Sequence, residues 1–398
     1  MYNTYRNTIF VKKGGKSILE VRHKIKLILN DTLKKYFDRC FGYDRYCWNM
    51  MLLMKKLNPE LRIEKEILTC FKKTRQDWEW ELPSTIPTQV SRDLARTYKR
   101  YKGELNYKTK SNPKQSFYVR NDVFAEGSWE RIGKHMKLCI GFGKACKVPD
   151  EKRWMLLTED PAYYGRSDYK LLSTTILKEY NEYYISFCIQ INGREPTQGT
   201  GQVGIDPGVK KVMTLSDGTE YNFPKKKLER LETKAKFYQA QMSRREIKGK
   251  EAQSNRYLKA KHKHQVTLRK MNAIKRDWMH KVTTEIVRKN KFIAWENCKA
   301  SVFMKNHHIA KSIAMSCWFT ISQMLKYKCE HHGATFIPVD PRKGATQACS
   351  HCGHKFKGKD RIKLSERRYV CPECGLEMDR DLNAAKNILN FALNLARA

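Results

Sequence analysis

Four cysteines near the end of the chain constrain its fold more than any other feature. They lie in two turns of the form Cys-x-x-Cys-Gly, "CSHCG" and "CPECG", with residues 353–370, 18 in number, between the second and third cysteine. This spacing is typical of a zinc site with four thiolate ligands, and such a site is structural because it leaves no open coordination position. The predicted ligands are Cys349, Cys352, Cys371 and Cys374. Two disulfides, or His351 or His354 as ligands, are the alternatives.

The charge of the chain predicts a polyanionic partner. Its 398 residues include 79 Lys and Arg against 41 Asp and Glu, a net charge of +38, and 40% of them are hydrophobic, as in a folded protein. Nucleic acid is the expected partner, with a membrane surface as the alternative. No apolar run reaches the roughly 18 residues of a membrane-spanning helix, and the first residues lack the apolar core of a signal peptide. The nine other cysteines are expected to be free thiols in a reducing compartment.

Hydrophobic periodicity divides the chain into three regimes. Residues 2–13 form a possible first strand, and helical spacing runs from about 20 to 110. Short strands separated by turns follow from about 115 to 195, so we expect a small β-rich domain with a helical block inserted after its first strand. From residue 203 onward a run of strands comes first, and the later strands alternate with helices. This order indicates an α/β domain.

Acids at three widely separated places lie at strand ends or at a helix start. Asp206 ends the strand "VGI", Glu296 ends "FIAW", and Asp379 and Asp381 precede the last helix. Converging carboxylates raise one another's pKa, and two Mg²⁺ ions would relieve that repulsion and promote phosphodiester hydrolysis. The order strand, strand and helix, with the first strand in a β-hairpin, fits an RNase H-like fold. The alternatives are a turn aspartate, a glutamate paired with a basic residue, and Asp381 as a helix N-cap.

Several of these segments resemble one known family. "VGIDPGVKKVMTLSDG", "FIAWEN", "IPVDPRKGATQACSHCGH" and "YVCPECGLEMDRDLNAAKNIL" are similar, in family order, to the RuvC nuclease of TnpB, the transposon-encoded RNA-guided DNA endonucleases related to compact type V CRISPR effectors. "ELPSTIPTQVSRDLARTYKRYKG" and "NEYYISFCIQI" also resemble TnpB text. The chain departs from the family pattern at Trp295 and Cys298, where an aliphatic residue and leucine are usual, and at "KGATQ".

The resemblance implies a domain order and a set of site residues. The implied parts are a wedge β-barrel at 1–20 and 116–199, a helical recognition domain at 21–115, and a RuvC domain at 200–398 with a zinc ribbon at about 343–378. The implied catalytic acids, which would also bind Mg²⁺, are Asp206, Glu296 and Asp381, since the third family acid begins an Asp-x-Asn-Ala-Ala run. The four cysteines match the ribbon. Asn383 and the two alanines after it would let the last helix pack close to the metal site.

The resemblance also implies cofactors and partners. These are two Mg²⁺ or Mn²⁺ ions, a structural Zn²⁺, a guide RNA from the transposon end and a double-stranded DNA target, in a monomer or dimer per guide. The expected location is the cytoplasm of a prokaryote, on the nucleoid. Two basic helical stretches are candidate nucleic-acid faces, with a solvated helix surface as the alternative. Their proposed contacts are Arg92, Arg96, Lys99, Arg100, Lys225, Lys226, Arg244 and Arg245. The basic loop between the cysteine turns is equally consistent with contact to nucleic acid and with a solvated surface loop.

Four other functions remain open at this stage. The first is a compact type V CRISPR effector with a CRISPR guide, and the second is a non-cleaving RNA-guided regulator, whose sign would be loss of an acid. The third is a guide-independent nuclease of the junction-resolving or RNase H type. The long N-terminal half and the zinc ribbon argue against it, because such a nuclease does not need them. A DNA-strand transferase would need a Tyr or Ser nucleophile constellation, which the sequence does not offer.

Overall fold

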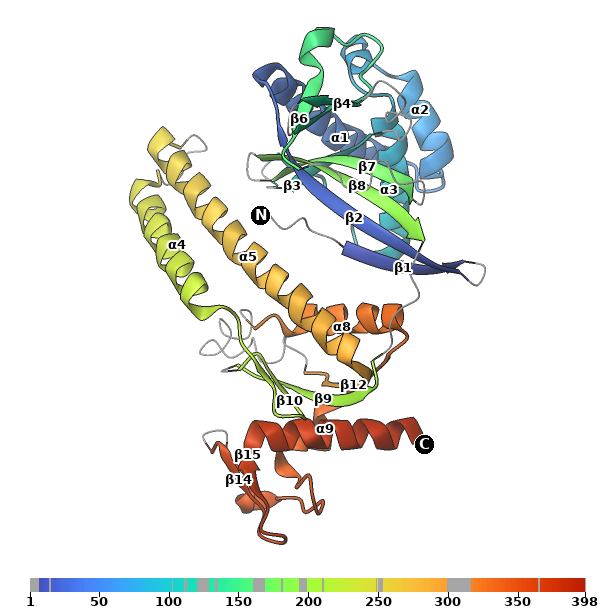
Figure 1. The fold of residues 1–398 in the computed structure, drawn as a ribbon. Helices are drawn as coiled ribbons and strands as arrows, with labels where there is room; N and C mark the ends of the chain where they lie inside the picture. Colours follow the sequence, from blue (N-terminus) through green and yellow to red (C-terminus); the bar gives the residue numbers. More distant parts are fainter. Residues whose placement is uncertain are drawn as a thin grey trace. The chain divides into compact units, whose positions relative to one another are not determined.

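The computed structural model divides into two compact units, Met1–Gly193 and Arg194–Ala398 (Figure 1). The division falls near the boundary at residue 200 expected before the nuclease domain. Each unit has its own sheet and its own core, so each is described by itself. The structure describes residues 7–13, 16–101, 103–110, 112, 114–119, 129–132, 135–159, 169–179, 182–192, 199–209, 211–247, 249, 253–298, 316–363 and 366–397.

Unit 1 is built on an eight-stranded sheet with the order β3-β7-β8-β2-β6-β5-β4, and β1 pairs with β2 off this path. Neighbouring strands are antiparallel throughout the described part of the sheet. The strands are β1 Asn7–Lys13, β2 Lys16–Ile28, β3 Lys114–Val119, β4 Trp129–Ile132, β5 His135–Cys139, β6 Trp154–Leu157, β7 Tyr169–Glu179 and β8 Glu182–Asn192. This path is open among the described residues, so closure into the expected wedge barrel remains a prediction.

The helical block of unit 1 begins at Asp31, later than the expected boundary at residue 21. The segment before it forms the long strand β2, because Ile25, Leu27 and Leu29 are buried while the residues between them face outward, a period of two. Asn30 then caps the first helix by accepting a hydrogen bond from the Leu33 amide at 2.8 Å. The helices are α1 Asp31–Leu57, a π-helical turn Ile63–Ile67, α2 Leu68–Lys73 and α3 Thr85–Arg100.

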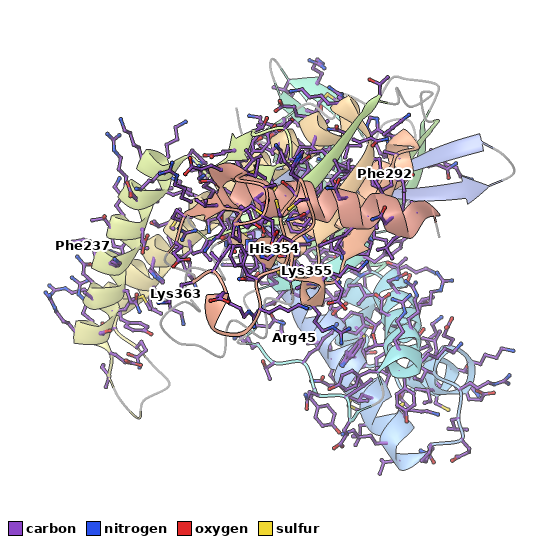
Figure 2. The ribbon with its side chains drawn as sticks, turned by 90° about the horizontal axis from the view of Figure 1, so that it is seen from below. Arg45, Phe237, Phe292, His354, Lys355 and Lys363 are labelled. Atoms are coloured by element: carbon purple, nitrogen blue, oxygen red, sulfur yellow. The ribbon has the colours of Figure 1, made fainter. Side chains whose placement is uncertain are left out.

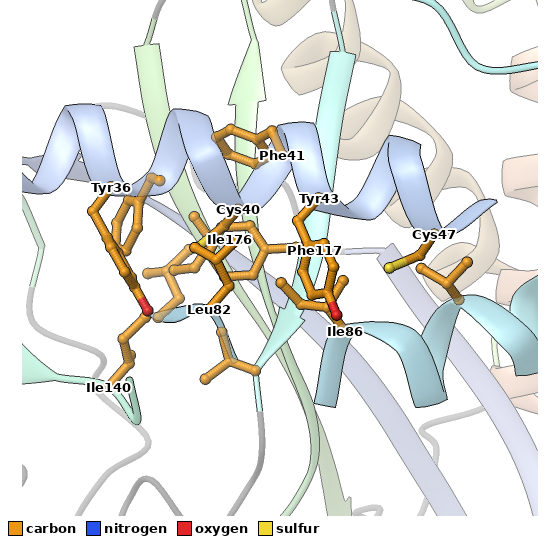
Figure 3. Close-up of a cluster of buried hydrophobic side chains, with 14 of the residues drawn as sticks. Tyr36, Cys40, Phe41, Tyr43, Cys47, Leu82, Ile86, Phe117, Ile140 and Ile176 are labelled. Carbon is orange, nitrogen blue, oxygen red and sulfur yellow. The ribbon is translucent and has the colours of Figure 1, made fainter. Parts of the chain in front are cut away.

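The core of unit 1 lies between α1 and the sheet. One face of α1 presents Tyr36, Phe37, Cys40, Phe41, Tyr43 and Cys47, all buried. Figure 3 shows this face above Phe117 and Ile176 from two strands and Leu82 and Ile86 from around the start of α3. The Phe117 ring makes T-shaped contacts with the rings of Phe37 and Phe41, whose centroids lie 5.6 and 5.2 Å away. The scattered cysteines Cys40 and Cys47 are thus free, buried thiols, as expected.

Unit 2 contains a five-stranded mixed sheet with the order β11-β10-β9-β12-β13. β9, β10 and β11 form an antiparallel meander, and β12 and β13 add in parallel to β9. The strands are β9 Gly201–Pro207, β10 Met213–Leu215, β11 Glu220–Tyr221, β12 Asn290–Glu296 and β13 Thr335–Val339. This arrangement confirms the expected α/β domain that opens with a hairpin.

Helices cover both faces of this sheet (Figure 1). Ile293 and Trp295 of β12 share one core with α5 (Asn255–Lys289) and α8 (Trp318–His332). Phe292 and Ala294, which alternate with them, share the opposite core with α9 (Arg380–Arg397). The domain is therefore a three-layer α/β/α structure, and the pleat of each strand decides which helix a side chain meets.

α4 (Lys225–Arg245) pairs with α5 as a helical hairpin beside the sheet (Figure 1). Within the described part of the chain, no helix is both long and apolar enough to cross a bilayer. The hairpin is instead rich in exposed basic residues, and the Phe237 side chain on α4 is also largely exposed (Figure 2).

We predict that Gly204→Ala destabilises unit 2 by about 1–3 kcal/mol. A Cβ atom at Gly204 of β9 would lie 2.1 Å from the Ala385 carbonyl oxygen and 2.7 Å from the Leu389 nitrogen of α9, so helix and strand would have to separate. The measurement is thermal or urea unfolding. Gly42→Ala in α1 is the matched control, because its nearest neighbour would be 3.7 Å away, and we expect it to be neutral or slightly stabilising. Equal effects of the two changes would contradict this account.

Candidate active site and metal-binding ribbon

Two of the predicted acids lie on adjacent strands. β9 and β12 run parallel with Ile205 opposite Trp295, which places Asp206 beside Glu296 at the ends of the two strands. Ile205 and Trp295 point into the core under α5 and α8. Because successive side chains alternate, Asp206 and Glu296 belong to the other face, which α9 covers.

The third acid reaches the same place from the first turn of α9. Burial, together with the charges of Glu296 and Asp381, raises the pKa of Asp206 well above its usual value. Burial also raises the pKa of Glu296. The structure therefore brings Asp206, Glu296 and Asp381 into one electrostatic group. Hard oxygen donors that repel one another in this way are suited to a divalent cation, so the donor set fits Mg²⁺ or Mn²⁺.

Asp379 has a different role from Asp381. Its Oδ1 accepts hydrogen bonds from the amides of Asp381 at 2.8 Å and Leu382 at 3.1 Å, so Asp379 is the N-cap of α9. Although burial opposes it, these two bonds and Lys211, 3.4 Å away, lower the pKa of Asp379. The alternative that Asp381 itself caps the helix is wrong, because Asp381 is the second residue of α9 and its carboxylate accepts hydrogen bonds from Arg380 and Arg367.

Two arginines hold the Asp381 carboxylate. The Arg380 guanidinium donates to Oδ1 at 3.0 Å, and Arg367 lies 3.5 Å from Oδ2. Arg380 is largely buried and also donates to the Lys363 carbonyl oxygen. Positive charge thus already balances the carboxylate of Asp381.

A cysteine accompanies Glu296. The Cys298 thiol lies 3.2 Å from Glu296 Oε2 and donates to it. Burial, with Glu296 and Asp206 next, raises the pKa of Cys298, so the thiol is a donor at neutral pH. Within the described residues no lysine or arginine forms an ion pair with Glu296, so the expected alternative of a structural ion pair does not hold there.

The four cysteines form a compact cluster with the geometry of a tetrathiolate site. All four sulfurs lie within 4.8 Å of one another, and the Cys349–Cys374 and Cys352–Cys371 separations are 3.7 and 3.5 Å. Disulfides are about 2.0 Å long, so the disulfide alternative is wrong. Four Zn–S bonds of about 2.3 Å place tetrahedral sulfurs roughly 3.8 Å apart. Gly353 and Gly375 have φ values of 78° and 70°, the conformation expected in each turn.

Neither histidine beside the first turn belongs to the metal-binding cluster of the described residues. His354 instead lies 3.6 Å from Glu373 and packs edge-on against Phe356. Behind the sulfurs, the short strands β14 (Arg368–Val370) and β15 (Glu377–Asp379) pair and bury Tyr369. The cluster thus has its own small core, as a ribbon requires.

Two asparagines of α9 attach the ribbon to the sheet domain. Asn383 donates to the Ala348 carbonyl oxygen at 2.7 Å and accepts from the Ser350 amide at 2.9 Å. Asn387 donates to the carbonyl oxygens of Ala345 and Ala348. Asn383 thus fixes the first cysteine turn, a more specific role than the close helix packing expected of it.

The residues predicted to contact nucleic acid lie on two helices, one in each unit. Arg92, Arg96, Lys99 and Arg100 are exposed on α3, and Lys225, Lys226 and Arg244 are exposed on α4, whereas Arg245 is half-buried. Arg92 also lines a cavity of about 480 Å³ with Lys72 and Arg75. On the ribbon, Figure 2 shows the side chains of Lys355 and Lys363, both exposed. These placements leave nucleic-acid contact a proposal.

Sequence reasoning missed the residues that act on the acids. No pattern marks Lys211, Arg367 and Arg380 in a chain so rich in basic residues. Asn387 was also missed, although it holds the ribbon and not an acid. Cys298 was visible as a departure from the TnpB pattern, but its distance from the glutamate was not.

Two family descriptions match parts of the chain. "Probable transposase" (OrfB_IS605) matches residues 185–306, and "Cas12f1-like, TNB domain" matches residues 318–388. Together they cover the β9–β12 region with its first two acids, and the ribbon with the start of α9.

Several curated proteins are similar in sequence. A "Putative RNA-guided DNA endonuclease" of Streptomyces pristinaespiralis is 33% identical over 49% of this chain and 46% of its own length. The chain therefore spans about half of that relative. A "Putative RNA-guided DNA endonuclease InsQ" of Escherichia coli is 26% identical over 79% of this chain and 76% of its own length. The CRISPR-associated endodeoxyribonuclease Cas12f1 of Sulfoacidibacillus thermotolerans is 34% identical over 18% of this chain and 16% of its own length.

A solved structure shares the fold. A chain of a Cas12f1–sgRNA–target DNA complex, determined by cryo-EM, superposes with a TM-score of 0.55 and 14% identity. The superposition covers 91% of this chain and 84% of that chain. At this identity the likeness concerns the fold.

We predict that Asp379→Ala lowers the free energy of unfolding by about 1 kcal/mol, because two amides in the first turn of α9 lose their acceptor. Asp379→Asn keeps a capping oxygen and is expected to lose only the weak, exposed pairing with Lys211. Chemical unfolding of both variants measures the difference. If alanine and asparagine were equally destabilising, the cap would not be the reason for Asp379.

Proposed function

We infer that this chain, which is a TnpB-type protein, is an RNA-guided DNA endonuclease whose hydrolytic centre consists of Asp206, Glu296 and Asp381. The observation that carries the proposal is the placement of these acids. Asp206 and Glu296 end adjacent paired strands, and Asp381 lies in the first turn of the helix that covers the same face. Two relatives, which align with 49% and 79% of this chain, carry the name "Putative RNA-guided DNA endonuclease".

The donor set supports metal-dependent hydrolysis. When bound, two Mg²⁺ ions would activate water and stabilise the leaving oxygen of a phosphodiester. Asp206 and Glu296 would hold them from rigid strand ends, where the positions of the carboxylates are fixed by backbone pairing. Asp381 would contribute from α9 after its oxygens leave Arg380 and Arg367.

The charge of the chain supports RNA and DNA as partners. A guide RNA and its target present dense phosphate charge, which the net charge of +38 complements. Base pairing would select the target, while the protein would hold the heteroduplex by its shape and charge. The exposed cations of α3 and α4 are the proposed phosphate contacts. A protein with these partners is expected on the nucleoid, in the cytoplasm of a prokaryote.

The other candidate functions fit less well. The Cas12f1 relative aligns with 18% of the chain, against 49% and 79% for the other two relatives, which does not favour a CRISPR effector. A non-cleaving regulator has no need for three converging acids. We therefore propose that the guide derives from the transposon end.

We predict that Asp206→Asn reduces cleavage of a matched DNA target to background, a loss of more than about 10³-fold, while guide binding is unchanged. The substitution removes the charge at the centre of the group but keeps the shape of the side chain. Cleavage would be measured on a plasmid with Mg²⁺ and the copurified RNA, and RNA binding by filter retention.

Asp217→Asn is the matched control for this experiment. Asp217 is exposed in the turn between β10 and β11, where it accepts a hydrogen bond from the Thr219 amide. We expect this variant to cleave like the wild type. Undiminished cutting by Asp206→Asn would refute the assigned centre.

We predict that Cys371→Ser removes the zinc ion from the protein, because three thiolates and a hydroxyl no longer close the tetrahedral site. Elemental analysis should give about one zinc per wild-type chain and close to none for the variant. Limited proteolysis should then cut between residues 343 and 378. Cys329→Ser, a buried free cysteine of α8, should keep its zinc. Wild-type protein without zinc would contradict the assignment.

A further inference from the structure

We propose that Cys298 is a positioning residue for Glu296, whose carboxylate it orients toward the metal-binding face through a hydrogen bond from its thiol to Oε2. The proposal rests on the nuclease centre inferred above. It assigns a role to a side chain that is not itself one of the three acids and that sequence comparison marks only as unusual.

The backbone around the pair is fixed on both sides. The Asn297 amide donates to the Val339 carbonyl oxygen at 2.9 Å, which extends the pairing of β12 with β13 one residue beyond Glu296. The Cys298 amide donates to the carbonyl oxygen of Glu296 at 2.9 Å and closes a tight turn. The Cα atoms of both residues are therefore held in place, and the thiol reaches the carboxylate from a rigid support.

The bond restricts a side chain that would otherwise be free to rotate. A glutamate loses conformational entropy when it is held in one rotamer, and it has three side-chain torsions to fix. The Cys298 thiol holds Oε2 at 3.2 Å and leaves Oε1 available as a ligand. A donor to a ligating carboxylate commonly changes metal affinity by 10–100-fold. Among the residues that the structure describes, the nearby arginines do not duplicate this restraint, since Arg380 and Arg367 engage Asp381 instead.

The surroundings of the thiol favour a fixed bond. Cys298 packs beside the core that contains Trp295 and Trp318, so its sulfur is partly shielded from water. Hydrogen bonds to a charged acceptor are stronger than neutral ones, and shielding reduces competition from solvent. Serine would keep a donor at this position, whereas alanine would remove it with little change in backbone preference.

The test is Mn²⁺ binding to the full-length chain free of nucleic acid, followed by the EPR signal of the free ion. We expect Cys298→Ala to weaken Mn²⁺ binding about 10-fold, and Cys298→Ser to retain most of the affinity. Cys329→Ala, which removes a buried thiol from the same core, should bind Mn²⁺ like the wild type. Near-UV circular dichroism checks that all variants are folded.

The variants test the role of Cys298 and the inferred nuclease centre separately. Wild-type affinity in Cys298→Ala, or equal losses in the alanine and serine variants, would overturn the positioning role. Asp206→Asn is measured in parallel, and we expect it to bind Mn²⁺ much more weakly. If Asp206→Asn also bound Mn²⁺ normally, the inferred nuclease centre would be wrong, and this outcome is distinct from failure of the Cys298 proposal alone.

Discussion

The close packing of α9 on β9 is the contact on which the second unit depends. Gly204 lets the Ala385 carbonyl oxygen approach so closely that a single methyl group would overlap it. This approach sets the height of α9 above the sheet. It thereby brings the first turn of the helix, with Asp381, level with the strand ends that carry Asp206 and Glu296. A helix seated farther from the sheet would leave two acids, too few to form the inferred centre.

Two opposing electrostatic effects meet at the N-terminus of α9. Its N-terminus favours negative charge, which Asp379 supplies as the cap. Asp381 adds a second acid near two more on the strands, and this repulsion is offset locally by Arg380 and Arg367. The arginines therefore serve as counter-ions that a divalent cation would replace. The excess positive charge of the chain is the feature that the proposed phosphate contacts would use.

The sequence predicted the parts of the site that depend on spacing along the chain. Two cysteine turns define the ribbon, and Asp206 and Glu296 stand out because acids seldom end apolar strands. Contacts between distant segments left no such pattern. The capping role of Asp379 could be predicted only if the first residue of α9 were known exactly. The hydrogen bonds of Asn387 depend on which carbonyl groups of the ribbon lie beside it. The strand β2 was not predicted, because its alternating buried and exposed residues run almost directly into α1, whose composition is similar.

The ribbon lies next to the acids because the chain passes directly from the ribbon into α9. β15 ends at Asp379 and α9 begins at Arg380, so no linker separates the metal-binding module from the helix. The Arg380 amide donates to the Arg367 carbonyl oxygen at 2.8 Å, which continues the pairing of β14 with β15 into the first residue of the helix. Any displacement of the ribbon must therefore move the cap of α9 and the two arginines that hold Asp381. A closed thiolate site does no chemistry itself, but it fixes the position from which Asp381, the third proposed acid, would act.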